Sequence, residues 1–288
     1  MIPTFVIFLR EGLEASIIIA ILCSYLIKIN KRSHFRDVYL GVVAAFGLVI
    51  IGGVGAYFLI RQYDGSNFQT YFETSTYVIA AAILTFMTFR MHKHARTMSK
   101  ELEARSDTAL TTGNRWGLGV LAFQAVGREG LETMVFTLAI VFASQRQAAT
   151  PVHGNLLLVG ALFGLVVSLG LAFAMYKFGA KLNLKWFFRV LGILLMLFAA
   201  GLLADAIENL QGLGWLNFGT HVLWNTSGTV TEGSNIGDIL HSLLGYADHP
   251  TVLQAAAWLL YVVISVGMFI LLGRHPRSST PANATASH

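Results

Sequence analysis

Residues 5–19 read FVIFLREGLEASIII, and residues 122–136 read AFQAVGREGLETMVF. Both stretches carry the same charged word, Arg-Glu-Gly-Leu-Glu, inside an apolar run; we call residues 10–14 the first motif and residues 128–132 the second motif. A charged side chain at the centre of a membrane helix costs about 2.5–3.5 kcal/mol. Ionisable residues at such depth face the bundle interior, are paired or coordinated, and mark functional sites. The two motifs therefore predict a buried site and the two helices that carry it.

The composition places the chain in a membrane. Of its 288 residues, 55% are hydrophobic and 12% are charged, too few polar residues to cover a water-soluble globule of this size. A bilayer core about 30 Å thick needs roughly 20 apolar residues in a helix. The sequence predicts an all-α membrane protein with seven transmembrane helices. The stretches concerned are Ile2 to Ile27, Val38 to Ile60, Phe72 to Met91, Trp116 to Ala143, Leu156 to Phe178, Phe187 to Leu210 and Val252 to Leu272.

Lysine and arginine cluster in every second connection between these stretches. They are dense in residues 28–36, 93–115 and 177–189 and again after residue 273, whereas the segment 211–251 holds none. Because basic residues collect on the cytoplasmic side, we expect the N-terminus outside and the C-terminus in the cytoplasm. The first stretch has no basic start and carries charges in its apolar run, so we expect it to stay in the mature protein. The prediction is a multi-pass protein of the cytoplasmic (inner) membrane.

The two motifs also mark an internal repeat. They lie 118 positions apart, and with this orientation the first runs from outside to inside and the second from inside to outside. That is the pattern of an inverted repeat of three helices plus three, in which the substrate site lies near the membrane midplane. The predicted organisation is a first three-helix repeat (1–92), a basic cytoplasmic loop (93–115), a second three-helix repeat (116–210), an extracytoplasmic segment (211–251), an extra seventh helix (252–273) and a disordered cytoplasmic tail (274–288).

Each motif holds two glutamates three residues apart. They are separated by about 60° around a helix, so both carboxylates lie on one face. Two such helices bring four carboxylates together as candidate metal ligands: Glu11, Glu14, Glu129 and Glu132. Oxygen donors without a thiolate or imidazole suit a hard cation, such as Mg, Ca, Mn or ferric iron, better than copper(I) or zinc.

The other motif residues are candidates for supporting roles. Arg10 and Arg128 each stand four residues before the second glutamate of their motif, so each guanidinium can pair along its own helix. Gly12 and Gly130 remove a side chain between the two acids. That permits the close approach of a neighbouring helix or of an ion.

With these residues, the sequence resembles the oxidase-dependent iron transporter family, whose mark is the doubled Arg-Glu-Gly-Leu-Glu word, and the similarity to its bacterial EfeU-type permeases covers nearly the whole chain. The resemblance implies a high-affinity iron permease whose four glutamates handle iron, with iron as transported substrate and no permanently bound cofactor. It implies Fe(III) as the ion moved, supplied as such or as Fe(II) that a partner oxidises, and periplasmic iron-binding or iron-oxidising partner proteins. The alternative is a permease for another cation such as Pb(II) or Mn(II).

Three more acidic residues are secondary candidates. Glu73 starts the third stretch at its outer end, where it either lines an entrance or stabilises the start of the helix. Asp205 and Glu208 repeat the three-residue acidic spacing near the outer end of the sixth stretch, where they either draw cations inward or are solvated at the membrane boundary. The segment 211–251 either captures metal or a periplasmic partner, or is an interfacial segment with aromatic anchors.

Two other classes of function compete with transport. Buried carboxylates suit acid–base chemistry, but the chain has no His-Glu-x-x-His or Gly-x-Ser-x-Gly sequence, so we expect no enzyme. A scaffold, in which each arginine pairs fully with one glutamate, would leave Glu11 and Glu129 as costly buried acids. The basic residues form no single stripe, so we expect membrane lipid as a partner and no nucleic acid.

Overall fold

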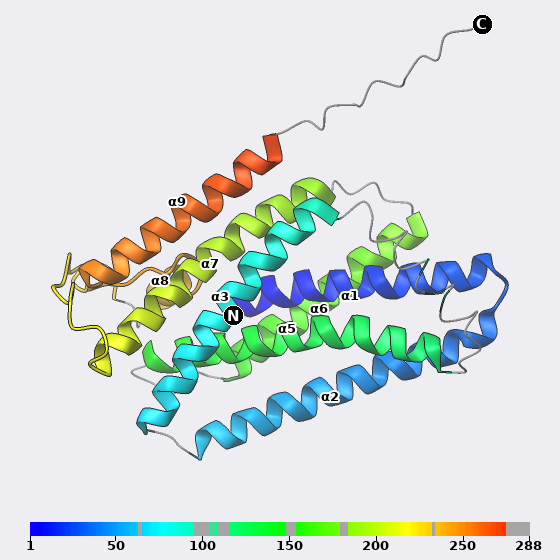
Figure 1. The fold of residues 1–288 in the computed structure, drawn as a ribbon, viewed down its shortest axis with the longest axis horizontal. Coiled ribbons are helices and arrows are strands. Elements are labelled where there is room, and N and C mark those ends of the chain that lie inside the picture. Colours follow the sequence, from blue (N-terminus) through cyan, green and yellow to red (C-terminus); the bar gives the residue numbers. More distant parts are fainter. Residues whose placement is uncertain are drawn as a thin grey trace, which may run out of the picture.

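Helices build the computed structural model of this chain (Figure 1), which describes residues 1–62, 65–94, 104, 106, 108, 116–147, 154–178, 184–231 and 234–274. Within these residues the strand-like pairing is one isolated bridge, between Val222 and Thr251. The all-α prediction is confirmed. The elements are α1 (Ile2–Lys28), η1 (Arg32–His34), α2 (Phe35–Arg61), α3 (Asn67–His94), α5 (Gly117–Gln147), α6 (Gly154–Phe178), α7 (Leu184–Gly212), α8 (Asn235–Leu244) and α9 (Val252–Arg274).

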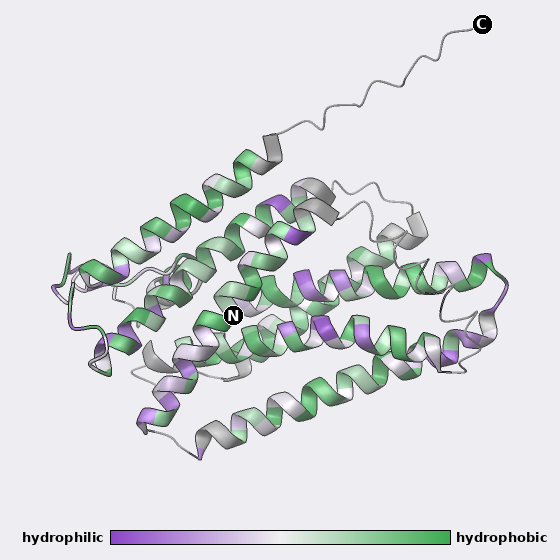
Figure 2. Cartoon of the chain, viewed as in Figure 1, coloured by the Kyte–Doolittle hydropathy of each residue, from purple (hydrophilic) through white to green (hydrophobic). Residues whose placement is uncertain are grey.

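Each of the seven stretches predicted from hydropathy is helical. Five helical segments in the described part of the chain are long and apolar enough to cross a membrane: Phe35–Phe58, Asn67–Met91, Leu156–Ala174, Trp186–Gly212 and Val252–Leu271. Helices α1 and α5 are as long, but each carries the charges of its motif, visible as hydrophilic bands in otherwise apolar helices (Figure 2). Most of the predicted basic loop (93–115) lies outside the described residues, as does the predicted tail apart from Arg274.

The helices associate in three main pairs, α1 with α6, α2 with α5, and α3 with α7. Glycines make the first pair close. A Cβ on Gly160 would lie 2.3 Å from the carbonyl oxygen of Met1, and a Cβ on Gly164 would lie 2.5 Å from that of Phe5. Small residues let membrane helices approach to backbone contact, where dispersion forces hold them. Because the contacts advance together along both chains, α1 and α6 run parallel.

Three glycine contacts of this pair have a counterpart between α5 and α2. Adding 118 to the number of the residue on α1 gives its counterpart on α5. Subtracting 119 from the number of the residue on α6 gives its counterpart on α2. Two helices of the first half thus meet two helices of the second half in the same way, with their roles exchanged. The matched contacts are Gly12 with Ser168 and Gly130 with Val49, Met1 with Gly160 and Gly119 with Gly41, and Leu9 with Gly164 and Gly127 with Ala45.

Helices α1 and α5 are antiparallel neighbours, as two apolar clusters demonstrate. The large apolar cluster joins the start of α1 to the end of α5 and to α3 and α7; it includes Val6, Ile7, Tyr77, Leu84, Phe136, Ile140, Leu195, Phe198 and Leu202. The small apolar cluster joins the end of α1 to the start of α5 and of α2; it consists of Ile18, Leu22, Leu26, Val38, Leu118 and Ala122. Both motifs lie between the two clusters along their helices.

Helix α8 lies in the segment 211–251 and was not predicted. Its signals are local: Ser234 caps the start by accepting a hydrogen bond from the Gly237 N–H at 3.0 Å, and Gly245 ends the helix at φ 69°. Serine at the N-cap and glycine just past the end are common helix boundaries. The Trp258 indole N–H of α9 donates to the Leu244 carbonyl at 2.7 Å, so α8 is tied to α9 as well as packed on α7.

We expect Gly41→Ala to destabilise the protein. Its Cβ would lie 2.1 Å from the carbonyl oxygen of Gly119 on α5, a backbone atom that cannot rotate away. Overpacking typically costs about 1–3 kcal/mol. Gly47→Ala, on the same helix, would meet nothing within 4 Å and is the matched control. Thermal unfolding in detergent measures both variants; equal melting temperatures would contradict the backbone contact between α2 and α5.

Candidate metal centre

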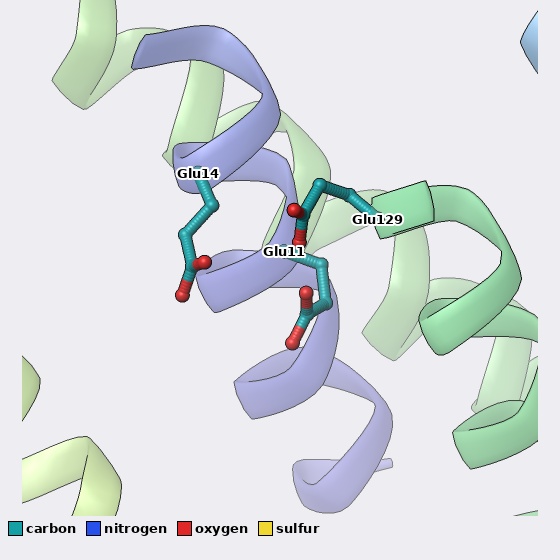
Figure 3. A group of neighbouring side chains, drawn as sticks. All are labelled: Glu11, Glu14 and Glu129. Atoms are coloured by element: carbon teal, nitrogen blue, oxygen red, sulfur yellow. The ribbon is translucent and has the colours of Figure 1, made fainter. Parts of the chain in front are cut away.

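The antiparallel packing of α1 and α5 brings glutamates of the two motifs together. Glu11 and Glu14 on α1 and Glu129 on α5 each offer a carboxylate oxygen, and these three oxygens lie within 4.8 Å of one another. Figure 3 shows the Glu129 side chain extending from α5 toward the two glutamates of α1. All three residues are buried. We call Glu11, Glu14 and Glu129 the carboxylate group.

Glu11 is the most unusual member of this group. Only 2% of the residue is exposed, and among the described residues neither of its carboxylate oxygens has a hydrogen-bond partner. The nearest ionic contact is Arg10 Nη1, at 4.0 Å from Glu11 Oε1. One oxygen of Glu129 likewise has no hydrogen-bond partner in the described part of the chain. Buried polar atoms are nearly always hydrogen-bonded, so oxygens like these indicate a missing partner such as an ion.

Each motif arginine pairs along its own helix, as its spacing predicts. Arg10 Nε donates to Glu14 Oε1 at 3.1 Å, and Arg128 Nε donates to Glu132 Oε1 at 2.9 Å. The two pairs differ in exposure. The side chains of Arg10 and Glu14 are each 3% exposed, whereas that of Arg128 is 40% exposed and that of Glu132 is 11% exposed. The first motif is sealed inside the bundle, and the second is open at its arginine.

Glu132 lies beside the carboxylate group and outside it. It is close enough to interact electrostatically with Glu11, Glu14 and Glu129. Its Oε1 accepts from Arg128, and its buried Oε2 has no hydrogen-bond partner among the described residues. Of the four predicted carboxylates, three therefore share one centre in this structure, and the fourth is held at its edge by Arg128.

Arg90 on α3 was missed by the sequence analysis. It interacts electrostatically with both Glu14 and Glu129. Its signal was present in the sequence, because an arginine near the end of the apolar stretch Phe72 to Met91 falls under the same rule that singled out the motifs. With Arg90 included, four glutamates face three arginines, so the fully ionised centre carries one net negative charge.

The motif glycines provide room for neighbouring helices. A Cβ on Gly12 would lie 2.4 Å from Ser168 Oγ of α6, and one on Gly130 would lie 2.7 Å from Val49 Cγ2 of α2. The sequence analysis allowed either a helix or an ion at these positions. In this structure a helix side chain fills the space beside each glycine.

The secondary candidates lie away from the carboxylate group. Glu73 on α3 is buried and accepts a hydrogen bond from Gln69 Nε2 at 2.8 Å. Glu208 on α7 accepts from Gln254 Nε2 of α9 at 3.1 Å. Asp205, one turn earlier, is buried and lies 3.5 Å from His241 Nε2 of α8. Although Asp205 and Glu208 are only three residues apart, Asp205 contacts α8 and Glu208 contacts α9.

Apolar side chains close the centre along the helix axes in both directions. Val6 and Ile7 of the large apolar cluster precede the first motif, and Phe136 of the same cluster follows the second motif. On the other side the small apolar cluster follows the first motif and precedes the second. These apolar layers separate the carboxylate group from both ends of the bundle along the helix axes.

Comparison with known proteins identifies the family. Residues 1–274 match the iron permease FTR1 family. The ferrous iron permease EfeU of Escherichia coli strain CFT073 is 34% identical over 292 residues, which cover 100% of this chain and 99% of that protein. The proteins of the same name from Shigella sonnei and Yersinia pestis are 33% and 32% identical, with 99% and 100% of this chain and 100% and 98% of theirs covered. No solved structure matches the chain.

The family match covers both motifs and all nine helical elements named above. Relatives that are permeases, together with several apolar helices long enough to cross a bilayer, make this a multi-pass membrane protein with iron as substrate. The prediction of the family is confirmed. This chain belongs to the iron permease FTR1 family.

Proposed function

We propose that this protein moves iron across the cytoplasmic (inner) membrane and that Glu11, Glu14 and Glu129 bind the ion on the way. The observation that carries the proposal is the buried carboxylate group between two antiparallel helices, in which both Glu11 oxygens and one Glu129 oxygen have no hydrogen-bond partner among the described residues. A cation would supply the missing partner and neutralise the charge. Glu132 would complete the four-glutamate site once its ion pair with Arg128 is broken.

The proposal includes seven membrane crossings in an inverted repeat, with the N-terminus outside and the C-terminus in the cytoplasm. Helices α1 and α5 would cross as well, because Arg10, Glu11, Glu14 and Glu129 are buried in the bundle and Arg128 is paired with Glu132 on its own helix. The matched contacts of α1 with α6 and of α5 with α2 support the repeat. The alternation of basic residues supports the orientation.

The arginines and apolar layers have separate tasks in this mechanism. Arg10 and Arg128 hold the second glutamate of each motif, and Arg90 offsets part of the negative charge when no ion is bound. The carboxylates exchange the hydration shell of the ion for protein oxygens. The large and small apolar clusters open in turn, so the site never faces both sides at once. Inverted repeats provide this alternation through rocking of helix groups around a fixed site.

Two oxidation states compete as the transported form. The all-oxygen donor set favours the harder Fe(III), which was the sequence-based prediction. The relatives are named for ferrous iron, which favours Fe(II) as the form presented to the protein. Both are accommodated when periplasmic iron-binding or iron-oxidising partners deliver the ion, with the last oxidation step upstream of the carboxylate group.

Uptake into proteoliposomes tests the proposal. We expect the purified protein to accumulate iron, and Mn(II) and Pb(II) to enter more slowly and compete weakly. Fe(II) kept reduced with ascorbate and Fe(III) kept soluble with citrate are compared with and without a proton gradient. Faster uptake of one form identifies the transported state. Failure to take up iron in either form, by protein that is folded and correctly inserted, would reject the permease assignment for this chain.

A further inference from the structure

A second set of metal-ligating side chains lies where α8 packs on α7. Asp205 and His241 are both buried, and His241 Nε2 lies 3.5 Å from Asp205 Oδ2. They line a cavity of about 10 Å³, close to the room that one water molecule needs. The rest of the wall is apolar or glycine: Ile140, Ala143, Phe198, Gly201 and Leu202. Asp205 and His241 are therefore the lining residues that can bind a cation.

The orientation of the imidazole suits metal binding. His241 Nδ1 lies 2.8 Å from the carbonyl oxygen of Tyr246. A carbonyl only accepts hydrogen bonds, so Nδ1 carries the hydrogen and donates it. In the neutral ring the lone pair is then on Nε2, the nitrogen that faces Asp205. Metal-binding histidines almost always donate their second N–H to a carbonyl or carboxylate in this way.

The distance between the two side chains also fits a shared ion. At 3.5 Å, Nε2 and Oδ2 are farther apart than the range of about 2.7–3.2 Å for a good N–H···O hydrogen bond. Two ligand atoms that each lie about 2.1–2.2 Å from one ion, at a tetrahedral angle, are separated by about 3.5 Å. The pair is therefore spaced as two ligands of one cation.

A backbone contact sets this spacing. A Cβ on Gly245 would lie 2.4 Å from the Cα of Gly201, so α7 and the end of α8 touch at their main chains. Gly201 is one helical turn before Asp205, and Gly245 is one turn after His241. The glycine contact fixes the register of the two helices and, with it, the separation of the two side chains.

The cavity is distinct from the carboxylate group. Its wall residues Ile140 and Ala143 follow Glu129 on α5 by 11 and 14 residues, which places them about 16–21 Å farther along the helix. Phe136, fully buried in the large apolar cluster, lies between them and Glu129 on the same helix. The cavity thus lies within the large apolar cluster, which lines most of its wall, and toward the end of the bundle that carries the segment 211–251.

We propose that Asp205 and His241 form a second metal site, which binds a divalent transition-metal cation before it passes to the carboxylate group. Imidazole with one carboxylate suits Fe(II) better than the all-oxygen centre does. Two protein ligands bind a cation less tightly than a full set does, which favours rapid release. The role in transit rests on the permease function proposed above, whereas the binding itself does not.

Co(II) absorption tests the binding without any transport. The purified protein carries glutamine in place of Glu11, Glu14 and Glu129, so the carboxylate group no longer binds. We expect this variant to bind one Co(II) per chain with visible bands, and Asp205→Asn or His241→Gln to weaken that binding at least about tenfold, the minimum typical for disturbing a metal site. His221→Gln, in the exposed part of the same segment, is the matched control and should leave binding unchanged.

A second measurement uses the otherwise native chain. Asp205→Asn should raise the KM for Fe(II) uptake about tenfold while the maximal rate per folded protein is kept, because capture is weakened and the carboxylate group is intact. If Asp205 and His241 formed only a structural ion pair, Asp205→Asn would instead lower the melting temperature and leave KM unchanged. The second site would be overturned if the protein bound no Co(II). It would also be overturned if these substitutions changed neither Co(II) binding nor KM. Absence of iron uptake by the unaltered chain would reject the permease function and leave the Co(II) result standing.

Discussion

Replacing Glu11 by glutamine is expected to stop iron uptake and leave the protein folded in its membrane. Glutamine has nearly the same shape, and neither Glu11 oxygen has a hydrogen-bond partner in the described structure, so the fold loses little. Arg10 keeps Glu14 as its partner in this variant, so the change leaves no buried charge without a partner. Transport, in contrast, loses a ligand from the centre of the carboxylate group. We expect a fall of more than about 100-fold, the upper end for residues that only support a metal ligand.

The measurement is iron uptake by proteoliposomes, normalised to the amount of inserted protein, together with the melting temperature. Glu208→Gln is the matched control, because the same chemical change is made on a membrane helix outside the carboxylate group. It should retain uptake. If Glu11→Gln transports iron at the wild-type rate, the carboxylate group is not the transport site.

Alanine at Arg10 and alanine at Arg128 should have very different effects on stability, although the two residues hold the same place in identical motifs. Arg10 and Glu14 are each 3% exposed, so removing the arginine leaves a buried carboxylate without its partner. Breaking a buried ion pair on one side typically costs about 3–5 kcal/mol. The Arg128 side chain is 40% exposed, and exposed pairs contribute about 1 kcal/mol or less.

Thermal unfolding of the two purified variants in detergent tests this difference. The double variant Arg10→Ala/Glu14→Gln should recover part of the lost stability, because Glu14 is then neutral, whereas Glu11 still lacks the arginine that lies 4.0 Å from it. Arg128→Ala/Glu132→Gln should differ little from Arg128→Ala. Equal losses for the two single variants would show that the motifs have equivalent surroundings in the folded protein, contrary to this structure.

Hydropathy and the two motifs were enough to predict the helices and the ion pairs within each motif. Stretches of about 20 apolar residues can satisfy their backbone groups in a bilayer only as helices, and each of the seven predicted stretches is helical with ends within a few residues of the prediction. The intrahelical pairs of Arg10 and Arg128 followed from their spacing alone. These features depend on local geometry, which the sequence determines directly.

Features that depend on packing between distant segments were not predictable in the same way. Arg90 interacts electrostatically with Glu14 and Glu129 because α3 packs against α5, and nothing in its own neighbourhood indicates those partners. The placement of Glu132 outside the carboxylate group likewise depends on how α5 is rotated. Asp205 was singled out with Glu208, and only the position of α8 reveals His241 as its neighbour.

The exchanged pairing of helices has a consequence for biosynthesis. α1 finds its main neighbour in α6 and α2 finds its main neighbour in α5, so the first three helices leave the translocation machinery before either partner has been made. Until α5 and α6 have been made, the largest interfaces of α1 and α2 therefore have no partner helix in the bilayer. The Arg10–Glu14 pair shields two of the three charges of the first motif during that time, since it needs only its own helix. The first half is thus an assembly intermediate, completed when the second half arrives.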